Sequence, residues 1–211
     1  MLTAAAPGSD HQMQFAKAFA NNAITPAHME KLKAILNGSE NGLVIDAEIR
    51  WYIFICGVKR GVFTVADIEA ESAKDNTAHG KQYTAYAHAA LPTKEAKDAA
   101  FKSITTDNLS NTIHSYMCRG FNENIHHELL AGFVDQYFDA ILKVWETKGF
   151  EIAETTATLL FPSWVIGEET VKKAQNWLDV TGKDASHALR RSVTEGRDAM
   201  SRAIKARAAD K

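Results

Sequence analysis

Cysteine is scarce in this chain of 211 residues, and neither sign of charge is in excess. The only two cysteines are Cys56 and Cys118, both in apolar surroundings. This excludes a disulfide framework and leads us to expect two buried free thiols in a reducing compartment, the cytoplasm. The formal net charge is −2, with acidic and basic residues interspersed. Such a balance gives no attraction for phosphate backbones or anionic lipids, so we expect neither nucleic acid nor a membrane as a partner.

Long hydrophobic runs and nucleotide-binding or serine-hydrolase motifs are also missing. The longest apolar run, at 49–58, contains Arg50 and is shorter than the roughly 20 residues that a membrane-spanning helix needs. No glycine-rich loop is followed by Lys-Ser or Lys-Thr, and no G-x-S-x-G sequence occurs. The sequence therefore gives no indication of a phosphate-binding loop or a nucleophilic serine.

A zinc-hydrolase helix needs two histidines one turn apart with a glutamate between them, because residues four apart share a helix face. His126-His127-Glu128 begins this pattern, but Ala131 stands where the second histidine is required. We therefore predict no catalytic residue and no metal ligand in this chain. A self-sufficient hydrolase built around His127 and Glu128 is the weakest of the functional hypotheses.

Helix start and stop signals are abundant along the chain. Thr25 precedes Pro26 at a predicted helix start, and Asn37-Gly38 supplies a left-handed stop. Asp46 predicts the start of a second helix, which ends at Gly61. Further predicted starts are Thr64, Asp75 or Asn76, Thr93, Asp107, Glu168 and Asp184, and further predicted stops are Gly120, Gly149 and Gly182. The pattern predicts ten or more short helices.

The predicted helices come in pairs at intervals of roughly 40 residues, the period of HEAT and armadillo arrays. The one strand-like run, at 52–55, lies between a good cap and Gly61, and we interpret it as a buried helix. We therefore predict an all-α, HEAT/armadillo-like superhelical array of antiparallel helix pairs. It forms a single domain over 1–211, with a flexible entry segment at 1–9 and a frayed tail at 205–211. Such arrays are curved and can hold elongated ligands on their concave face.

Arg50 and Trp51 are the first candidates for contact with a ligand. A guanidinium beside an aromatic ring suits the carboxyl end of a peptide, because arginine binds carboxylates in a bidentate manner. The alternative is that Arg50 forms an ion pair between helices beside a core tryptophan. Large aromatic residues at helical spacing are commonly core residues, and the same interpretation applies to the other three tryptophans.

Several blocks of sequence, in this order and at these spacings, resemble the C-terminal domain of the aminopeptidase N family. The resemblance is strongest to the actinobacterial lysyl-aminopeptidase-like branch, and it extends over nearly the whole chain. The blocks include PGSDHQ at 7–12, GLVIDAEIRW at 42–51, DNTA at 75–78 with the stretch that runs to Lys97, and LRRSVTEGRD at 189–198.

The resemblance implies that the parent protein is a zinc metallopeptidase that removes N-terminal residues from peptides. Its zinc would be bound by an upstream catalytic domain that carries H-E-x-x-H and G-x-M-E-N, neither of which occurs here. This chain would then be the non-catalytic domain that caps the catalytic cleft and gates or holds the peptide. Its partners would be the catalytic domain of the same polypeptide and peptide substrates. Family position adds Arg119 and Arg190 to the candidate groove residues.

An independent helical scaffold remains the alternative function. A free-standing α-solenoid could bind a peptide or protein on its concave face without belonging to an enzyme. Residue patterns alone separate these two hypotheses poorly.

Overall fold

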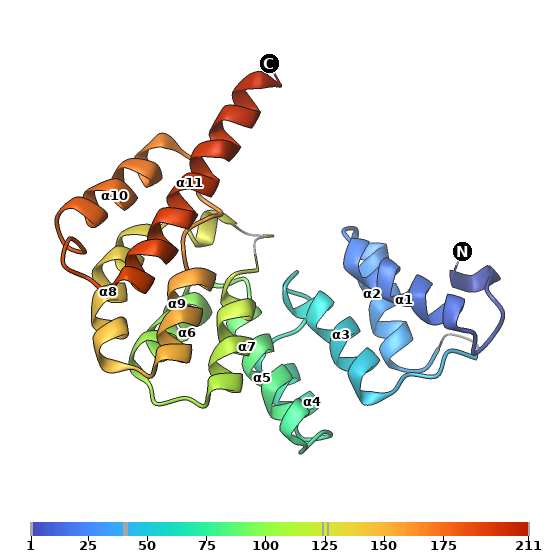
Figure 1. Cartoon of the computed structure of the whole chain (residues 1–211). Coiled ribbons are helices and arrows are strands. Elements are labelled where there is room, and N and C mark those ends of the chain that lie inside the picture. The colour runs from blue at the N-terminus through green and yellow to red at the C-terminus, as the bar shows by residue number, and fades with distance from the viewer. Residues whose placement is uncertain (1, 40–41, 124, 126, 211) are drawn as a thin grey trace.

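The computed structural model of the chain describes residues 2–39, 42–123, 125 and 127–210 (Figure 1). Within these residues all regular secondary structure is helical, and there is no strand. The helices of the first half are η1 (Leu2–Ala4), α1 (Asp10–Asn22), α2 (Pro26–Leu36), α3 (Ala47–Val58), α4 (Val65–Ser72) and α5 (Ala78–Ala90). Those of the second half are α6 (Lys94–Thr106), α7 (Asn111–Phe121), η2 (His127–Leu129), α8 (Phe133–Thr147), α9 (Phe150–Leu159), α10 (Glu168–Asp179) and α11 (His187–Ala209).

Side-chain caps start most of these helices, as the sequence predicts. The side chains of Thr25, Asp46, Thr64 and Thr93 each accept a hydrogen bond from the backbone N–H three residues later. These four predicted starts are confirmed.

Two predicted stops are also confirmed by backbone conformation. Gly38 and Gly61 have φ angles of +75° and +73°, a left-handed conformation that glycine adopts without steric cost. The chain can therefore turn sharply after α2 and α3.

Three predicted starts are wrong by one to three residues. The observed N-caps are Thr77, Ser110 and Ser186 in place of Asp75 or Asn76, Asp107 and Asp184. In each of these segments a hydroxyl residue lies a few positions after the acidic candidate, and its oxygen is the one that faces the N–H groups of the first turn. The predicted stop at Gly120 differs, because Gly120 lies in the last turn of α7. The predicted stop at Gly149 is confirmed, because this residue directly follows Lys148, the C-cap of α8, and it also serves as the N-cap of α9.

The helices pack as a two-layer array. Each odd-numbered helix from α1 to α9 packs against the next odd-numbered one, and each even-numbered helix packs on an odd-numbered neighbour. Figure 1 shows α1 and α2 at one end of the array and α10 and α11 at the other, with α5 and α7 between them. The predicted all-α, HEAT/armadillo-like fold is confirmed.

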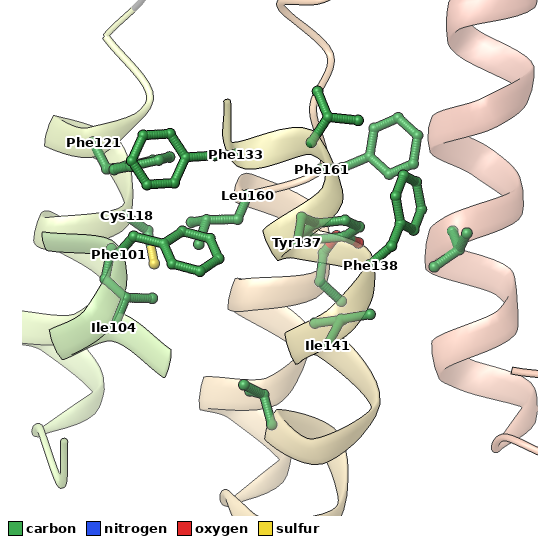
Figure 2. Packing of buried hydrophobic residues seen from close by; sticks show 14 of the residues in the cluster. Phe101, Ile104, Cys118, Phe121, Phe133, Tyr137, Phe138, Ile141, Leu160 and Phe161 are labelled. Atoms are coloured by element: carbon green, nitrogen blue, oxygen red, sulfur yellow. The ribbon is translucent and has the colours of Figure 1, made fainter. Parts of the chain in front are cut away.

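Two hydrophobic clusters fill the array. The N-terminal core joins α1 to α5 around Leu32, Trp51 and Ile68, and it also includes the buried side chain of Leu2. The C-terminal core runs from α5 to α11 and is rich in aromatic rings, several of which Figure 2 shows in edge-to-face contact. Helix α5 belongs to both, since Ala87 faces the first core and Ala89 the second.

Both cysteines are buried and free, as predicted. The strand-like run at 52–55 lies within α3, so its interpretation as a helix is confirmed. No helix in the part of the chain that the structure describes is long and apolar enough to cross a membrane.

The most extensive helix contact is that between α5 and α7. A Cβ atom placed on Gly120 would lie 2.2 Å from the carbonyl oxygen of Tyr86 and 3.1 Å from the Cβ of Ala89. The two backbones therefore approach as closely as they do because residue 120 has no side chain.

We predict that Gly120→Ala lowers the free energy of unfolding by roughly 1–3 kcal/mol, since the added methyl group forces α5 and α7 apart. Chemical denaturation followed by circular dichroism measures this change. Gly132→Ala is the matched control, because no atom lies within 4 Å of a Cβ placed there. Equal stability of the two variants would contradict the close approach.

Candidate functional site

Helices α1, α3, α5 and α7 border a cleft of about 290 Å³, which we call the tyrosine cleft. Four of the five tyrosines in the chain line it. These are Tyr52, Tyr83, Tyr86 and Tyr116, and the charged lining residues are Lys17, Glu48, Lys59, Arg119 and Glu123. All four helices belong to the odd-numbered layer, so the array presents this concentration of phenol rings on one face.

Helical spacing explains why these side chains converge. Tyr83 and Tyr86 lie three residues apart on α5, and Tyr116 and Arg119 lie three apart on α7. Side chains at this spacing share a helix face. Because α5 and α7 are in close contact, their two faces meet at the same cleft.

Ring contacts brace the walls of the cleft. Tyr83 stacks on Trp51 with ring centroids 5.9 Å apart, and Tyr116 meets Tyr83 edge to face at 5.7 Å. On the opposite wall the Lys17 amine lies 5.9 Å from the ring centroid of Tyr52, within the range of a cation–π contact.

The phenol groups of Tyr52, Tyr83 and Tyr86 are neutral at physiological pH, because the pKa of each is raised above the ordinary value. Burial raises the pKa of both Tyr52 and Tyr83 above the ordinary value. The cleft therefore presents amphipathic rings whose hydroxyl groups can donate and accept hydrogen bonds.

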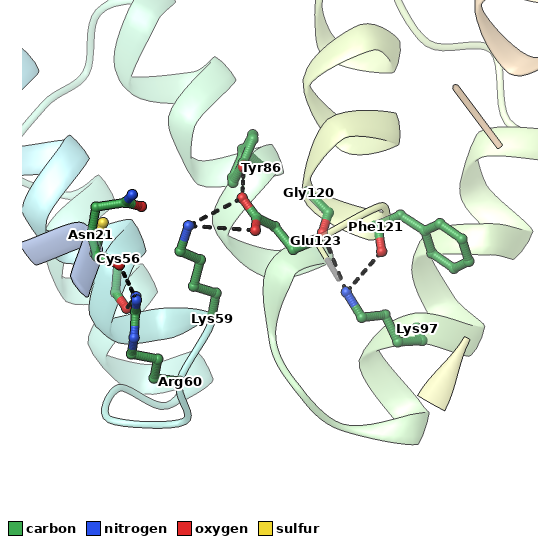
Figure 3. Close-up of polar contacts among 9 residues, drawn as sticks. All are labelled: Asn21, Cys56, Lys59, Arg60, Tyr86, Lys97, Gly120, Phe121 and Glu123. Carbon is green, nitrogen blue, oxygen red and sulfur yellow. Dashed lines mark hydrogen bonds and ion pairs between the residues drawn. The ribbon is translucent and has the colours of Figure 1, made fainter. Parts of the chain in front are cut away.

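A carboxylate lies at the inner end of the cleft. Glu123 accepts a hydrogen bond from the Tyr86 hydroxyl, and its second oxygen lies 3.4 Å from the Lys59 amine (Figure 3). Burial is the main reason that the pKa of Tyr86 is raised, and the negative charge of Glu123 adds to it. We call Lys59 and Tyr86 together the Lys59–Tyr86 site.

Lys97 holds the ends of α5 and α7 together. Its amine donates to the carbonyl oxygen of Ala89 at 2.7 Å. It also donates to the carbonyl oxygens of Phe121 at 3.0 Å and Gly120 at 3.3 Å (Figure 3). The residue is 2% exposed. Burial lowers the pKa of Lys97 to about 8, although the negative charge of Glu123 acts in the opposite direction.

The first two predicted site residues, Arg50 and Trp51, do not line the tyrosine cleft, although Trp51 stacks on Tyr83 from behind its wall. Both guanidinium edges of Arg50 are occupied, because two nitrogens donate to the Glu71 carboxylate and a third donates to the Leu36 carbonyl at 2.7 Å. Trp51 is 1% exposed, and its Nε1 donates to Asp75 at 2.9 Å. This arrangement is the ion pair beside a core tryptophan that the sequence offers as the alternative.

Arg119 lies in the tyrosine cleft, whereas Arg190 does not. Arg190 donates from Nη1 to the carbonyls of Leu178 at 2.7 Å and Gly182 at 2.6 Å, which closes the end of α10. Among the described residues Arg119 has no hydrogen-bond or ion-pair partner for its guanidinium, and its side chain is exposed. The structure thus brings only one of the four predicted residues to the cleft.

The tyrosines and Glu123 were missed by sequence reasoning, although a signal for the tyrosines exists. The i, i+3 pairs on α5 and α7 are visible in the sequence. The sequence does not reveal that α5 and α7 are neighbours, or that the helix faces carrying these pairs line the same cleft.

A larger groove of about 800 Å³ lies between α4 and α6 on the even-numbered face. Its lining is mainly apolar and includes four alanines together with Phe63, Leu91 and Met117, and only His88 and Glu95 carry ionisable groups. The groove thus offers few polar groups to orient a ligand, and we place the candidate site at the tyrosine cleft.

Metal ligands do not cluster in the part of the chain that the structure describes. No three His, Cys, Asp or Glu side chains lie close enough there to hold an ion. His127 begins the short η2 helix, and His126 lies outside the described residues. The donor set of these described residues does not fit a zinc ion.

The fold defines the class of this protein as a helical-array domain. The model of a family described as ERAP1-like C-terminal domain matches residues 2–202. Aminopeptidase N of Streptomyces lividans is 37% identical over 212 residues, which cover 99% of this chain and 24% of the relative.

The chain belongs to this family and corresponds to the C-terminal domain of aminopeptidase N-like enzymes. It spans about a quarter of the length of the relative that it matches.

We predict that Lys97 makes the stability of the fold depend on pH above neutrality. The folded protein releases the Lys97 proton near pH 8, whereas the unfolded chain keeps it to about pH 10.5. Raising the pH from 8 to 10 therefore favours the folded state, by about 2 kcal/mol from this group. Methionine does not titrate, so between pH 8 and 10 the free energy of unfolding of the wild type should rise by about 2 kcal/mol relative to that of Lys97→Met.

Denaturation at a series of pH values measures the difference. Tyrosine and cysteine titrate in both proteins, so their contributions cancel. Lys102→Met is the control, because Lys102 lies on the same helix and is exposed. Profiles of wild type and Lys97→Met that stay parallel from pH 8 to 10 would contradict the prediction.

Proposed function

We propose that this chain is the substrate-gating domain of a longer zinc aminopeptidase that removes N-terminal residues from peptides. In this proposal the domain caps the catalytic cleft of the same polypeptide and holds the distal part of the peptide in the tyrosine cleft. Catalysis and zinc binding belong to the part of the enzyme outside this chain. The proposed location is the cytoplasm, a reducing compartment compatible with two free thiols.

The observation that carries the proposal is the concentration of four of the five tyrosines around one cleft. Tyrosine supplies a large contact area at low entropic cost, and its hydroxyl can bond to peptide amides and carbonyls. Tyrosine is accordingly common among the residues that dominate binding energy. A cleft of this composition suits a peptide of varied sequence better than a single small metabolite.

Arg119 gives the cleft a group that can orient the peptide. Its guanidinium is exposed at the cleft and, among the described residues, has no ion-pair partner. Arginine binds carboxylates and backbone carbonyls with fixed geometry, so it can fix one end of a bound peptide. The relative named aminopeptidase N supports the assignment to an enzyme that acts on peptides.

We predict that the chain binds a fluorescein-labelled decapeptide and that Tyr116→Ala weakens the binding about tenfold, the size typical of an aromatic contact residue. Fluorescence anisotropy measures the affinity. Phe150→Ala is the control, because Phe150 is 62% exposed but lies on α9, outside the cleft. Equal affinity of both variants for the peptide would place the binding surface elsewhere.

In the longer enzyme we predict that Tyr116→Ala lowers kcat/KM for decapeptides several-fold and leaves kcat/KM for single aminoacyl dyes unchanged. A single residue attached to a dye is too short to reach from the catalytic centre into another domain. Steady-state kinetics with both substrate classes tests this expectation. An equal loss for both classes would indicate a structural effect on catalysis and would count against gating.

A further inference from the structure

Glu123 joins three helices at the inner end of the tyrosine cleft. It follows the last turn of α7, accepts a hydrogen bond from Tyr86 on α5, and pairs with Lys59 just after α3. The side chains of Lys59 and Glu123 are 13% and 19% exposed, so water screens this pair only partly. Figure 3 shows the Glu123 carboxylate between the Lys59 amine and the Tyr86 hydroxyl.

Lys97 fixes the position of Glu123 from the other side. Its amine donates to the carbonyls of Gly120 and Phe121, the residues that end α7 just before Glu123. The same amine donates to Ala89 at the end of α5. The Glu123 carboxylate is therefore attached to a backbone segment that is anchored to both central helices.

The Lys59–Tyr86 site has the composition of a carboxylate-binding site, with one ammonium group and one hydroxyl donor. In this structure its ligand comes from the chain itself. A peptide carboxylate that approached it would meet the charge of Glu123 at short range, where like charges repel. A neutral side chain would meet no such repulsion.

We propose that Glu123 determines the specificity of the tyrosine cleft, because its carboxylate occupies the Lys59–Tyr86 site and so favours neutral peptide side chains there over acidic ones. This inference rests on the proposed function, in which the cleft holds a peptide.

Glu123→Gln tests the inference. Glutamine keeps the shape of the side chain and can still accept the Tyr86 hydrogen bond, but it leaves Lys59 without its carboxylate. The probes are two fluorescein-labelled decapeptides that differ only in that the glutamates of one are glutamines in the other. Relative to the wild type, the variant should shift the ratio of the two affinities about tenfold toward the glutamate peptide, as expected for one partly screened charge.

Glu48→Gln is the matched control. Glu48 lines the same cleft and carries the same charge, but among the described residues it has no hydrogen bond or ion pair to Lys59. Its replacement should change the affinity ratio less than threefold. An equal shift in both variants would mean that the general charge of the cleft, and not the occupied Lys59–Tyr86 site, sets the preference.

Lys59→Met provides a second readout that does not require Glu123 to be replaced. It leaves the Glu123 charge without its cation, so the ratio of the two affinities should shift toward the glutamine peptide. Thermal melting of each variant monitors folding, and a purely structural role would weaken both peptides equally. Unchanged affinity ratios in Glu123→Gln and Lys59→Met would overturn the inference, whereas failure of both peptides to bind the wild type would overturn the proposed function as well.

Discussion

Helices α5 and α7 lie close together because Gly120 presents no side chain to the backbone of Tyr86. Each half of the array has its own hydrophobic core, and α5 contributes residues to both. The contact between α5 and α7 is therefore where the two halves meet. Lys97 strengthens it by donating to the carbonyls that end both helices, groups that would otherwise remain unsatisfied in a buried place.

The tyrosine cleft depends on this contact. The pairs of residues spaced three apart on α5 and α7 face one cleft because the two helices are held at a fixed distance. The same arrangement places Glu123 beyond the end of α7, where it reaches Tyr86 and Lys59. Some residues that line the cleft, such as Tyr86 and Glu123, therefore also hold the helices together. A change in ligand affinity at this site is informative only if it depends on the charge of the ligand, because a loss of stability would weaken all ligands alike.

Arg50 and Trp51 show where sequence reasoning reaches its limit. An arginine beside a tryptophan is compatible with a peptide site and equally with a core position, and adjacent helix residues point about 100° apart. The core arrangement is the one observed, because α4 brings Glu71 to Arg50 and because Asp75 accepts a hydrogen bond from Trp51. Residues twenty or more positions away decided the environment, and no local pattern encodes that pairing.

The sequence by itself determined the helices, the all-α fold and the family, because caps, left-handed glycines and apolar spacing are local or follow the order of the chain. The free, buried state of both cysteines followed from their apolar surroundings in the same way. Only the tertiary structure decided which polar side chains meet. The tyrosines of three helices converge, Lys97 binds three carbonyls, and Glu123 fills the Lys59–Tyr86 site because non-adjacent helices pack at a distance set by one glycine.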